Sequence, residues 1–374
     1  MLATIFHIQL RITVGALVVL LYMSTFFPTP RRDDHANTRL VYPTNITIYI
    51  RDEVNEHDST FRTNLLQRFG TGRLNYHVHG VMAACDNNSC NAQETVTTDH
   101  YSSASTSPCL AVSKHASPTS YCDHATLRCS YPRCKTVITG DEYCKLTMFD
   151  VRHYYSHNAN DHHQIYLPLG PRYDSWEALQ LIKQSPDFVN KPPSSRRFAF
   201  NAIFTLQTNL GREILANRLS KVKTHNGNNN SLPIYTAFSR RWSAIDEVKN
   251  VDANKLNPQS YMEVVLDSIF TISPAGHNAE CFRLHEAVEA GSIPVLIKED
   301  LYSSSGDCVE PLHHWQDAPI IVLNSWDEVS LMVDVLLGHG IEWLDQMQQD
   351  LREWYDGHMR KVVREFEDYL MEAT

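Results

Sequence analysis

Between residues 135 and 338 the chain alternates short apolar runs with amphipathic runs of about a dozen residues. Runs such as RRFAFNAIFTL (196–206) and IFTI have the length of strands, and PQSYMEVVLDS between them has helical periodicity. This alternation predicts α/β architecture with parallel sheets. Two such sets, divided near KPPSSRR (191–197), predict two Rossmann-like domains at residues 44–195 and 196–374.

The predicted first domain begins with the strand TNITIYI (44–50) and contains a second strand, KTVIT (135–139). Between them, residues 83–134 are rich in Ser, Thr, Asn and Cys with little periodicity, which predicts a disulfide-stapled insertion that adds nothing to the core. At the other end, residues 341–370 form an amphipathic pattern, and we expect a long helix that packs back across both domains.

The N-terminus carries an apolar run over residues 12–27, which is the short end of a membrane span. A cleaved signal peptide is the alternative, but no small-x-small cleavage site follows the run. The pattern therefore predicts an uncleaved signal anchor, with residues 1–11 as a cytoplasmic tail and 28–43 as a stem.

Sequons and clustered cysteines indicate that the rest of the chain is lumenal. Seven of the nine cysteines lie between Cys85 and Cys144, and their irregular spacing favours disulfides over zinc. Cys281 and Cys308 lie apart from this cluster and could bridge each other. The predicted N-glycosylation sites are Asn45, Asn87 and Asn229.

Charge and histidine placement exclude two classes of function. A formal net charge of -10 argues against a nucleic-acid partner, so an anionic ligand must be met by a local set of donors. His77 and His79 share one face of a strand without further ligands nearby, so no metal site is predicted. The adjacent pair His313 and His314 is expected to be a solvated part of a loop.

The segment SPAGHNAECFRLHEAVEAGSIPV (273–295) has the pattern of a loop, helix and strand after the strand IFTI. We expect Asn278 as the helix N-cap and Gly291 at the C′ position. Ligands bind outside the carboxyl ends of strands in such sheets, where helix N–H groups favour a phosphate and Arg283 could neutralise it. Glu286 could accept hydrogen bonds from a ribose. Spacing alone equally allows Glu280, Arg283 and Glu286 to pair on a solvated helix.

The same segment, with its P-x-G-x-N-x-E-C-F-R-L-x-E-A pattern and GSIPV ending, resembles the exostosin-like glycosyltransferases. GDEYC (140–144), YLPLGPR (166–172), RRFAFNAIFTL and DAPIIVLNSWDE (317–328) are similar to segments of that superfamily in the same order, so the resemblance covers roughly residues 135–370. It implies a GT-B fold, with an acceptor-side domain at 44–195 and a nucleotide-sugar-binding domain at 196–374. The donor-binding residues that it implies are Gly276, Asn278, Glu280, Arg283 and Glu286.

The N-x-E-C form is similar to the branch that transfers xylose from UDP-xylose to ribitol phosphate on the O-mannosyl glycan of α-dystroglycan. This resemblance implies a type II Golgi membrane protein with a secretory glycoprotein acceptor, with other Golgi transferases as candidate partners. No D-x-D occurs, so the resemblance implies a metal-independent, inverting reaction without a cofactor. Another UDP-sugar with a glycosaminoglycan acceptor, or a catalytically silent glycan-binding protein, are the alternatives.

Inversion requires a general base in the acceptor-side domain. Asp141 and Glu142, after the strand KTVIT, are the candidates, although turn carboxylates that cap a helix would have the same pattern. Arg172, in the PLGPR turn, is the candidate for binding an acceptor phosphate, with a surface salt bridge as its alternative.

Overall fold

The computed structural model describes residues 44–51, 68–81, 109–114, 134–139, 151–152, 155–156, 165–220, 232–240, 256–276, 279–302, 308–309 and 312–372. Residues 43–374 belong to one compact unit. The expected tail, anchor and stem lie outside the described residues, as do Asn87, Asn229, Asp141, Glu142 and Asn278. None of the described helices is long and apolar enough to cross a membrane.

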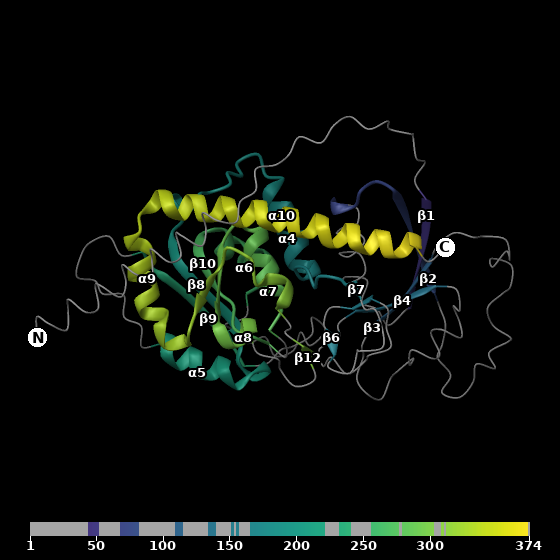
Figure 1. Cartoon of the computed structure of the whole chain (residues 1–374). Coiled ribbons are helices and arrows are strands. Elements are labelled where there is room, and N and C mark those ends of the chain that lie inside the picture. The colour runs from purple at the N-terminus through teal and green to yellow at the C-terminus, as the bar shows by residue number, and fades with distance from the viewer. Residues whose placement is uncertain are drawn as a thin grey trace, which may run out of the picture. The chain divides into compact units, whose positions relative to one another are not determined.

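A six-stranded parallel sheet occupies the first half of the compact unit, in the order β2-β1-β3-β4-β5-β7 (Figure 1). Its strands are β1 (Thr44–Arg51), β2 (Leu74–Val81), β3 (Cys109–Lys114), β4 (Lys135–Thr139), β5 (Val151–Arg152) and β7 (Ile165–Tyr166). A short antiparallel pair lies beside it, formed by β6 (Tyr155–Ser156) and β12 (Cys308–Val309).

The position of β3 contradicts the expectation that residues 83–134 add nothing to the core. This strand pairs with β1 on one side and β4 on the other, and Leu110 is 2% exposed in the core. Only six residues, CLAVSK, make the strand, so their pattern is too short to stand out from the polar sequence around them. Cys134, just before β4, is buried and disulfide-bonded.

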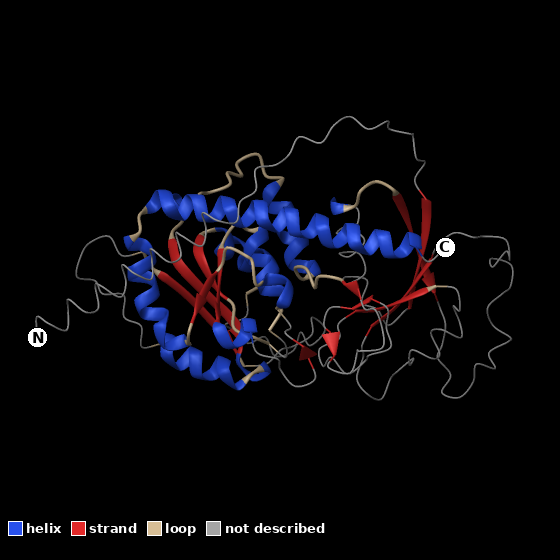
Figure 2. Ribbon diagram, viewed as in Figure 1, coloured by secondary structure: helices blue, strands red, loops and turns tan. Residues whose placement is uncertain are grey.

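A five-stranded parallel sheet forms the second half, in the order β13-β11-β10-β8-β9, and helices enclose it (Figure 2). Its strands are β8 (Phe198–Thr205), β9 (Ile234–Ser239), β10 (Ser268–Ile272), β11 (Ile293–Ile297) and β13 (Ile321–Leu323). Counted along the chain, the strand order is 2-1-3-4-5, that of a doubly wound sheet. The α/β prediction with parallel sheets is confirmed.

Seven described helices and several short 3-10 turns complete this half. The turns include η2 (Pro193–Ser195), η4 (His313–Trp315) and η5 (Trp326–Glu328). The helices are α4 (Tyr173–Lys183), α5 (Leu210–Leu219), α6 (Pro258–Leu266), α7 (Phe282–Glu289), α8 (Lys298–Tyr302), α9 (Val329–Gly338) and α10 (Ile341–Glu372). Every residue of β10 and β11 is buried, as both faces of the sheet are covered. From α7, Leu284 and Val288 pack into this core, as their spacing predicts.

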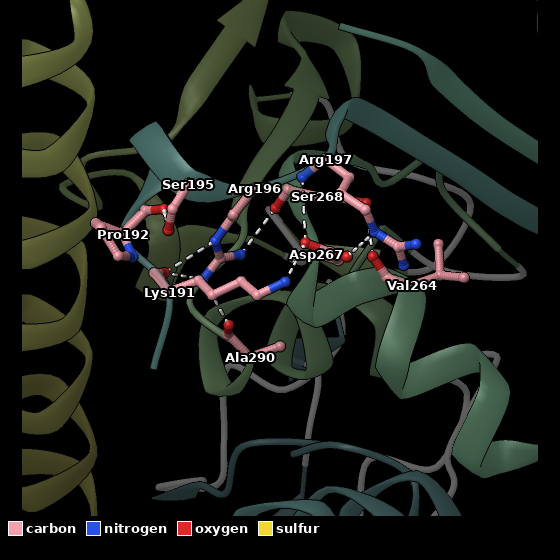
Figure 3. A network of polar contacts seen from close by, with 9 residues as sticks. All are labelled: Lys191, Pro192, Ser195, Arg196, Arg197, Val264, Asp267, Ser268 and Ala290. Carbon is pink, nitrogen blue, oxygen red and sulfur yellow. Dashed lines mark hydrogen bonds and ion pairs between the residues drawn. The ribbon is translucent and has the colours of Figure 1, made fainter. Parts of the chain in front are cut away.

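The amino edge of the five-stranded sheet is closed by a polar network around the linker that precedes β8 (Figure 3). Asp267 accepts hydrogen bonds from Lys191 Nζ at 2.8 Å and from the Arg197 backbone N–H at 3.1 Å, and it also pairs with the Arg197 side chain. The Arg196 guanidinium donates to the carbonyls of Ser268 at 2.8 Å and Ala290 at 3.0 Å. The linker is therefore fixed to the starts of β8 and β10.

Helix α10 confirms the expected long C-terminal helix and contacts both halves (Figure 1). Near its start, Asp345 accepts hydrogen bonds from the backbone and side chain of Ser194 at 3.2 Å. Near its end, the fully buried Glu367 accepts one from Thr71 Oγ1 at 2.5 Å, and Arg73 pairs with Asp368 at 2.8 Å. Thr71 and Arg73 lie just before β2, so α10 is tied to both sheets.

The C-terminal end of α7 supplies a stability test. Gly291 has φ +69°, and the N–H groups of Gly291 and Ser292 donate to Val288 and Ala287 at 2.8 Å, which is a Schellman motif. A Cβ on Gly291 would stand 2.1 Å from Arg352 Nη2. We expect Gly291→Ala to lower the free energy of unfolding by about 1–2 kcal/mol, because the left-handed conformation strains any L-residue.

The matched control is Gly357→Ala, in the interior of α10, where an added Cβ meets nothing within 4 Å. We expect this variant to raise the free energy of unfolding by about 0.5–1 kcal/mol, because Ala favours a helix interior over Gly. Urea unfolding of both variants measures the difference, and equal effects would contradict the role assigned to Gly291.

Candidate functional site

The carboxyl edge of the five-stranded sheet is where the chain reverses direction between β8 and β10, the position at which doubly wound folds bind ligands. Three segments meet at this edge. Helix α5 follows β8, the loop 273–276 follows β10, and α8 follows β11. The loop and α8 begin directly after their strands, and α5 begins after the short 3-10 turn η3 (Leu206–Thr208), so the sheet fixes where all three start.

The loop 273–276 is held mainly through its carbonyl groups. Arg212 of α5 donates from Nε to Ala275 O at 2.8 Å and from Nη2 to Pro274 O at 3.1 Å. Asn209, the N-cap of α5, donates from Nδ2 to Gly276 O at 3.2 Å. Gly276, a predicted donor contact, therefore lies at this edge with its carbonyl turned toward α5.

Arg212 is a buried cation with a third carbonyl bond, from Nη1 to Thr205 O at 3.2 Å. Burial and, after it, the neighbouring charge of Arg283 lower the pKa of Arg212 to about 10, while Cys281 and Asp300 act in the opposite sense. A lowered pKa marks a guanidinium whose positive charge is incompletely compensated by its surroundings.

Arg283 faces the same aromatic ring as Arg212. The Cζ atoms of both arginines lie 5.9 Å from the Phe204 ring centroid, near enough for cation–π attraction. In the described part of the chain, the buried Nε of Arg283 has no hydrogen-bond partner and its guanidinium forms no ion pair. The predicted phosphate-binding arginine therefore lies at the carboxyl edge with donors to spare.

Asp300, in α8, is the carboxylate that faces this loop. Its Oδ2 accepts a hydrogen bond from the Ala275 backbone N–H at 3.3 Å. Burial raises the pKa of Asp300 to about 6, against the opposing effects of that hydrogen bond and of Arg212. The carboxyl group thus titrates about one pH unit below neutrality, well above an ordinary Asp.

Glu286 is buried and does not belong to a solvated charge ladder. It is 4% exposed, and its Oε2 accepts a hydrogen bond from Tyr261 Oη at 2.6 Å. Its Oε1 faces the backbone N–H of Arg172 at 3.4 Å. Burial, followed by the charge of Glu286, raises the pKa of Tyr261 well above its usual value, so the phenol remains a donor to this carboxylate. A carboxylate has further lone pairs for a ligand hydroxyl.

Glu280 joins the two halves of the compact unit. Its Oε1 accepts hydrogen bonds from Tyr166 Oη at 2.9 Å and Leu169 N at 3.1 Å, and it lies 2.7 Å from His285 Nε2. His285 Nδ1 in turn lies 3.0 Å from Tyr355 Oη, in α10. At 2% exposure, Glu280 has a position suited to holding the site together, and donor contact by this residue stays a prediction.

Two expectations for the start of α7 are wrong. The N-cap is Cys281, not Asn278, because the Glu280 side chain turns toward Tyr166 and His285 and the helix begins only at Phe282. Cys281 is also a free thiol, so it does not bridge Cys308.

His314 is not solvated as expected, because its ring stacks on Tyr166 at 3.9 Å between centroids. Burial lowers the pKa of His314 to about 4. The ring is therefore neutral at physiological pH and belongs to the packing around Tyr166.

Arg172 lies beside Glu286, with its Nε paired to Asp174 and its side chain 37% exposed. It begins α4 as the N-cap; Ser175 is buried in the first turn, and its N–H donates to Asp174 Oδ1 at 2.8 Å. Arg172 thus approaches the site from the turn after β7, and its side chain is only partly exposed.

The structure therefore brings Gly276, Glu286, Arg283 and Arg172 toward one edge, and it adds residues that the sequence did not single out. The missed residues are Arg212, Asn209 and Asp300. Each stands in the first turns after the carboxyl end of a strand, and that position was the available signal. No group of three or more metal-ligating side chains occurs among the residues that the structure describes.

The joining role of Glu280 is testable. We expect Glu280→Ala to lower the free energy of unfolding by about 1–3 kcal/mol or more, because Tyr166 Oη and the Leu169 N–H lose a buried acceptor. Chemical denaturation measures the change. Glu299→Ala, at an exposed carboxylate of α8, is the control and should remain within about 0.5 kcal/mol of the wild type. Comparable losses in both variants would contradict the role.

Comparison with known proteins places the chain in a family. A model described as the RXYLT1 C-terminal domain matches residues 182–373, more than half of the chain. Ribitol-5-phosphate xylosyltransferase 1 of Danio rerio is 25% identical over 219 residues, covering 57% of this chain and 46% of that protein. The Homo sapiens protein of the same name is 24% identical over 187 residues, covering 47% and 38%. The chain thus spans less than half the length of these curated relatives.

Among solved structures, an alpha-glucosyltransferase (AGT) in complex with UDP superposes with a TM-score of 0.49 at 13% identity, covering 88% of this chain and 100% of that one. The family model, by contrast, spans the complete five-stranded sheet and the site at its carboxyl edge. The chain belongs to the family of the RXYLT1 C-terminal domain.

Proposed function

We propose that this protein is a glycosyltransferase that transfers xylose from UDP-xylose to ribitol phosphate. The observation that carries the proposal is Arg283, a cation with unused donors at the carboxyl edge of a doubly wound sheet, in a chain of the RXYLT1 C-terminal domain family. The sugar and the acceptor come from the name of the relatives, ribitol-5-phosphate xylosyltransferase 1. They extend to this chain as part of the proposal.

The proposed donor site uses the residues of the carboxyl edge. Arg283 binds the diphosphate, and the loop through Gly276 and Asn278 surrounds it. Glu286, held by Tyr261 at 2.6 Å, accepts hydrogen bonds from the ribose hydroxyls. Because the negative charge on the leaving diphosphate grows as the sugar departs, a fixed guanidinium stabilises the transition state more than the ground state.

The proposed reaction is a direct displacement with inversion. An acceptor hydroxyl oxygen attacks C1 of xylose, the bond from C1 to the diphosphate oxygen breaks, and UDP leaves with the electron pair. A general base takes the hydroxyl proton, and Asp141 and Glu142 remain the candidates. Arg172, which reaches the site from the turn after β7, is the proposed contact for the acceptor phosphate. No metal ion or cofactor is required in this scheme.

The resemblance to exostosin-like transferases extends the proposal to a cellular setting. We place the protein in the Golgi membrane as a single-pass type II protein, with the O-mannosyl glycan of α-dystroglycan as its acceptor. Its predicted anchor (12–27) and its sequons support this setting. Other Golgi transferases are proposed partners.

A panel of donors tests the function. The full chain, purified in mild detergent, should unfold at a higher temperature with UDP-xylose, because a ligand at 100 times its Kd adds about 2.7 kcal/mol of stability. UDP-xylose should also be hydrolysed slowly to UDP and xylose. UDP-glucuronate and UDP-N-acetylglucosamine are the controls. Stronger stabilisation by either of them than by UDP-xylose would favour the glycosaminoglycan alternative. Binding of a UDP-sugar without hydrolysis or transfer would favour a catalytically silent glycan-binding protein. If no UDP compound raised the unfolding temperature, the proposal would be wrong.

Arg283→Ala tests the donor site. We expect UDP affinity to fall by about 10- to 100-fold, the usual loss for hydrogen bonds to a charged group. The unfolding midpoint should stay near that of the wild type, since the described contacts of Arg283 include no hydrogen bond. Arg218→Ala, which removes an exposed cation paired with Asp327, is the matched control and should leave Kd unchanged. Isothermal titration with UDP measures both, and normal UDP binding by Arg283→Ala would exclude its role.

A further inference from the structure

We propose that Arg212 is a second cation of the diphosphate site, which both fixes the loop 273–276 and supplies positive charge to the bound anion. This inference rests on the proposed function for the identity of the anion as part of a nucleotide sugar. The physical site, two guanidinium groups at one sheet edge, rests on contacts alone.

Arg212 is rigidly placed by its own hydrogen bonds. Its three carbonyl bonds reach Thr205 at the end of β8 and Pro274 and Ala275 after β10. A guanidinium has five N–H groups, so two remain for another acceptor. Since the acceptors are neutral carbonyls, they orient the cation without cancelling its charge.

Arg212 and Arg283 form a like-charge pair over Phe204. Bringing two cations together where water is partly excluded is unfavourable unless an anion compensates for it. Neither guanidinium forms an ion pair with a carboxylate in the described ranges. The carboxylate that opposes the charge of Arg212 is Asp300, which bonds to the Ala275 N–H. The arrangement lacks an anion of the kind that a diphosphate provides.

Titration calorimetry with inorganic pyrophosphate and UDP, at low and high salt, tests the inference. We expect Arg212→Met to weaken both ligands by roughly tenfold or more and to flatten the salt dependence of Kd, because one cation is gone. Arg212→Lys, which keeps the charge but not the three-carbonyl fork, should keep most of the salt dependence. Arg218→Met, also on α5, is the matched control and should bind as the wild type does.

The outcomes separate the inference from the proposed function. If Arg212→Met binds with wild-type affinity and salt dependence, the role of Arg212 is overturned and the proposed function stays intact. If Arg212→Met binds more weakly but its Kd keeps the wild-type salt dependence, Arg212 has a structural role alone, and the inference is again overturned without affecting the function. A wild type that binds pyrophosphate but no UDP compound would overturn the function and keep the anion site. A wild type that binds neither would overturn both.

The free thiol of Cys281 allows a test on the wild-type protein, without any substitution. Cys281 lies close enough to Arg212 to raise the pKa of that guanidinium, so its reactivity reports the local positive charge. In the wild type, anionic iodoacetate should alkylate Cys281 faster, relative to neutral iodoacetamide, than it alkylates N-acetylcysteine. Pyrophosphate should abolish that preference and slow both reagents. Mass spectrometry of the Cys281 peptide measures the rates. No preference, together with no protection by pyrophosphate, would overturn the inference.

Discussion

One carboxylate oxygen, Oε1 of Glu280, is the contact on which the arrangement of the site depends. A carboxylate at 2% exposure is strongly unfavourable unless donors surround it, and here they come from separate parts of the chain. Tyr166 ends the last strand of the six-stranded sheet, Leu169 belongs to the turn after it, and His285 lies on α7. Satisfying this oxygen therefore requires both halves to be folded and in contact, and the same contact brings the turn with Arg172 beside Glu286.

The two edges of the five-stranded sheet are chemically different. At the amino edge, Asp267 pairs with both Lys191 and Arg197, and the carbonyls of Ser268 and Ala290 accept hydrogen bonds from Arg196. At the carboxyl edge, Arg212 donates to three carbonyls, and the buried Nε of Arg283 has no hydrogen-bond partner among the described residues. The cations of the amino edge thus have carboxylate and carbonyl partners, whereas the carboxyl edge keeps donors that the described contacts leave unused.

The sequence predicted the elements whose patterns are long or strongly apolar. The strands β8, β10 and β11 and the helix α10 were expected from their periodicity, and Gly291 was placed correctly because a left-handed residue after a helix favours glycine. The six-residue β3 was missed, since its burial comes from neighbouring strands and not from its own pattern.

The sequence located site residues correctly at the sheet edge where position along the chain decided the outcome, and it failed where a tertiary partner did; their ligand contacts stay predictions. Arg283 was placed by the strand that precedes its loop. Glu280 and Glu286 were not expected to be buried, because Tyr166 and Tyr261 lie 114 and 25 residues away from them. Arg212 was missed for the same reason, since its carbonyl partners belong to another loop.

Helix α10 has a mechanical consequence for movement of the two sheets. At about 1.5 Å per residue, its 32 residues make a rod roughly 48 Å long. Ser194 holds it near one end and Thr71 near the other. A rotation of the two sheets against each other must then bend the helix or break the buried hydrogen bond between Glu367 and Thr71. Any such rotation therefore works against an elastic element, and the return to the described arrangement releases that strain.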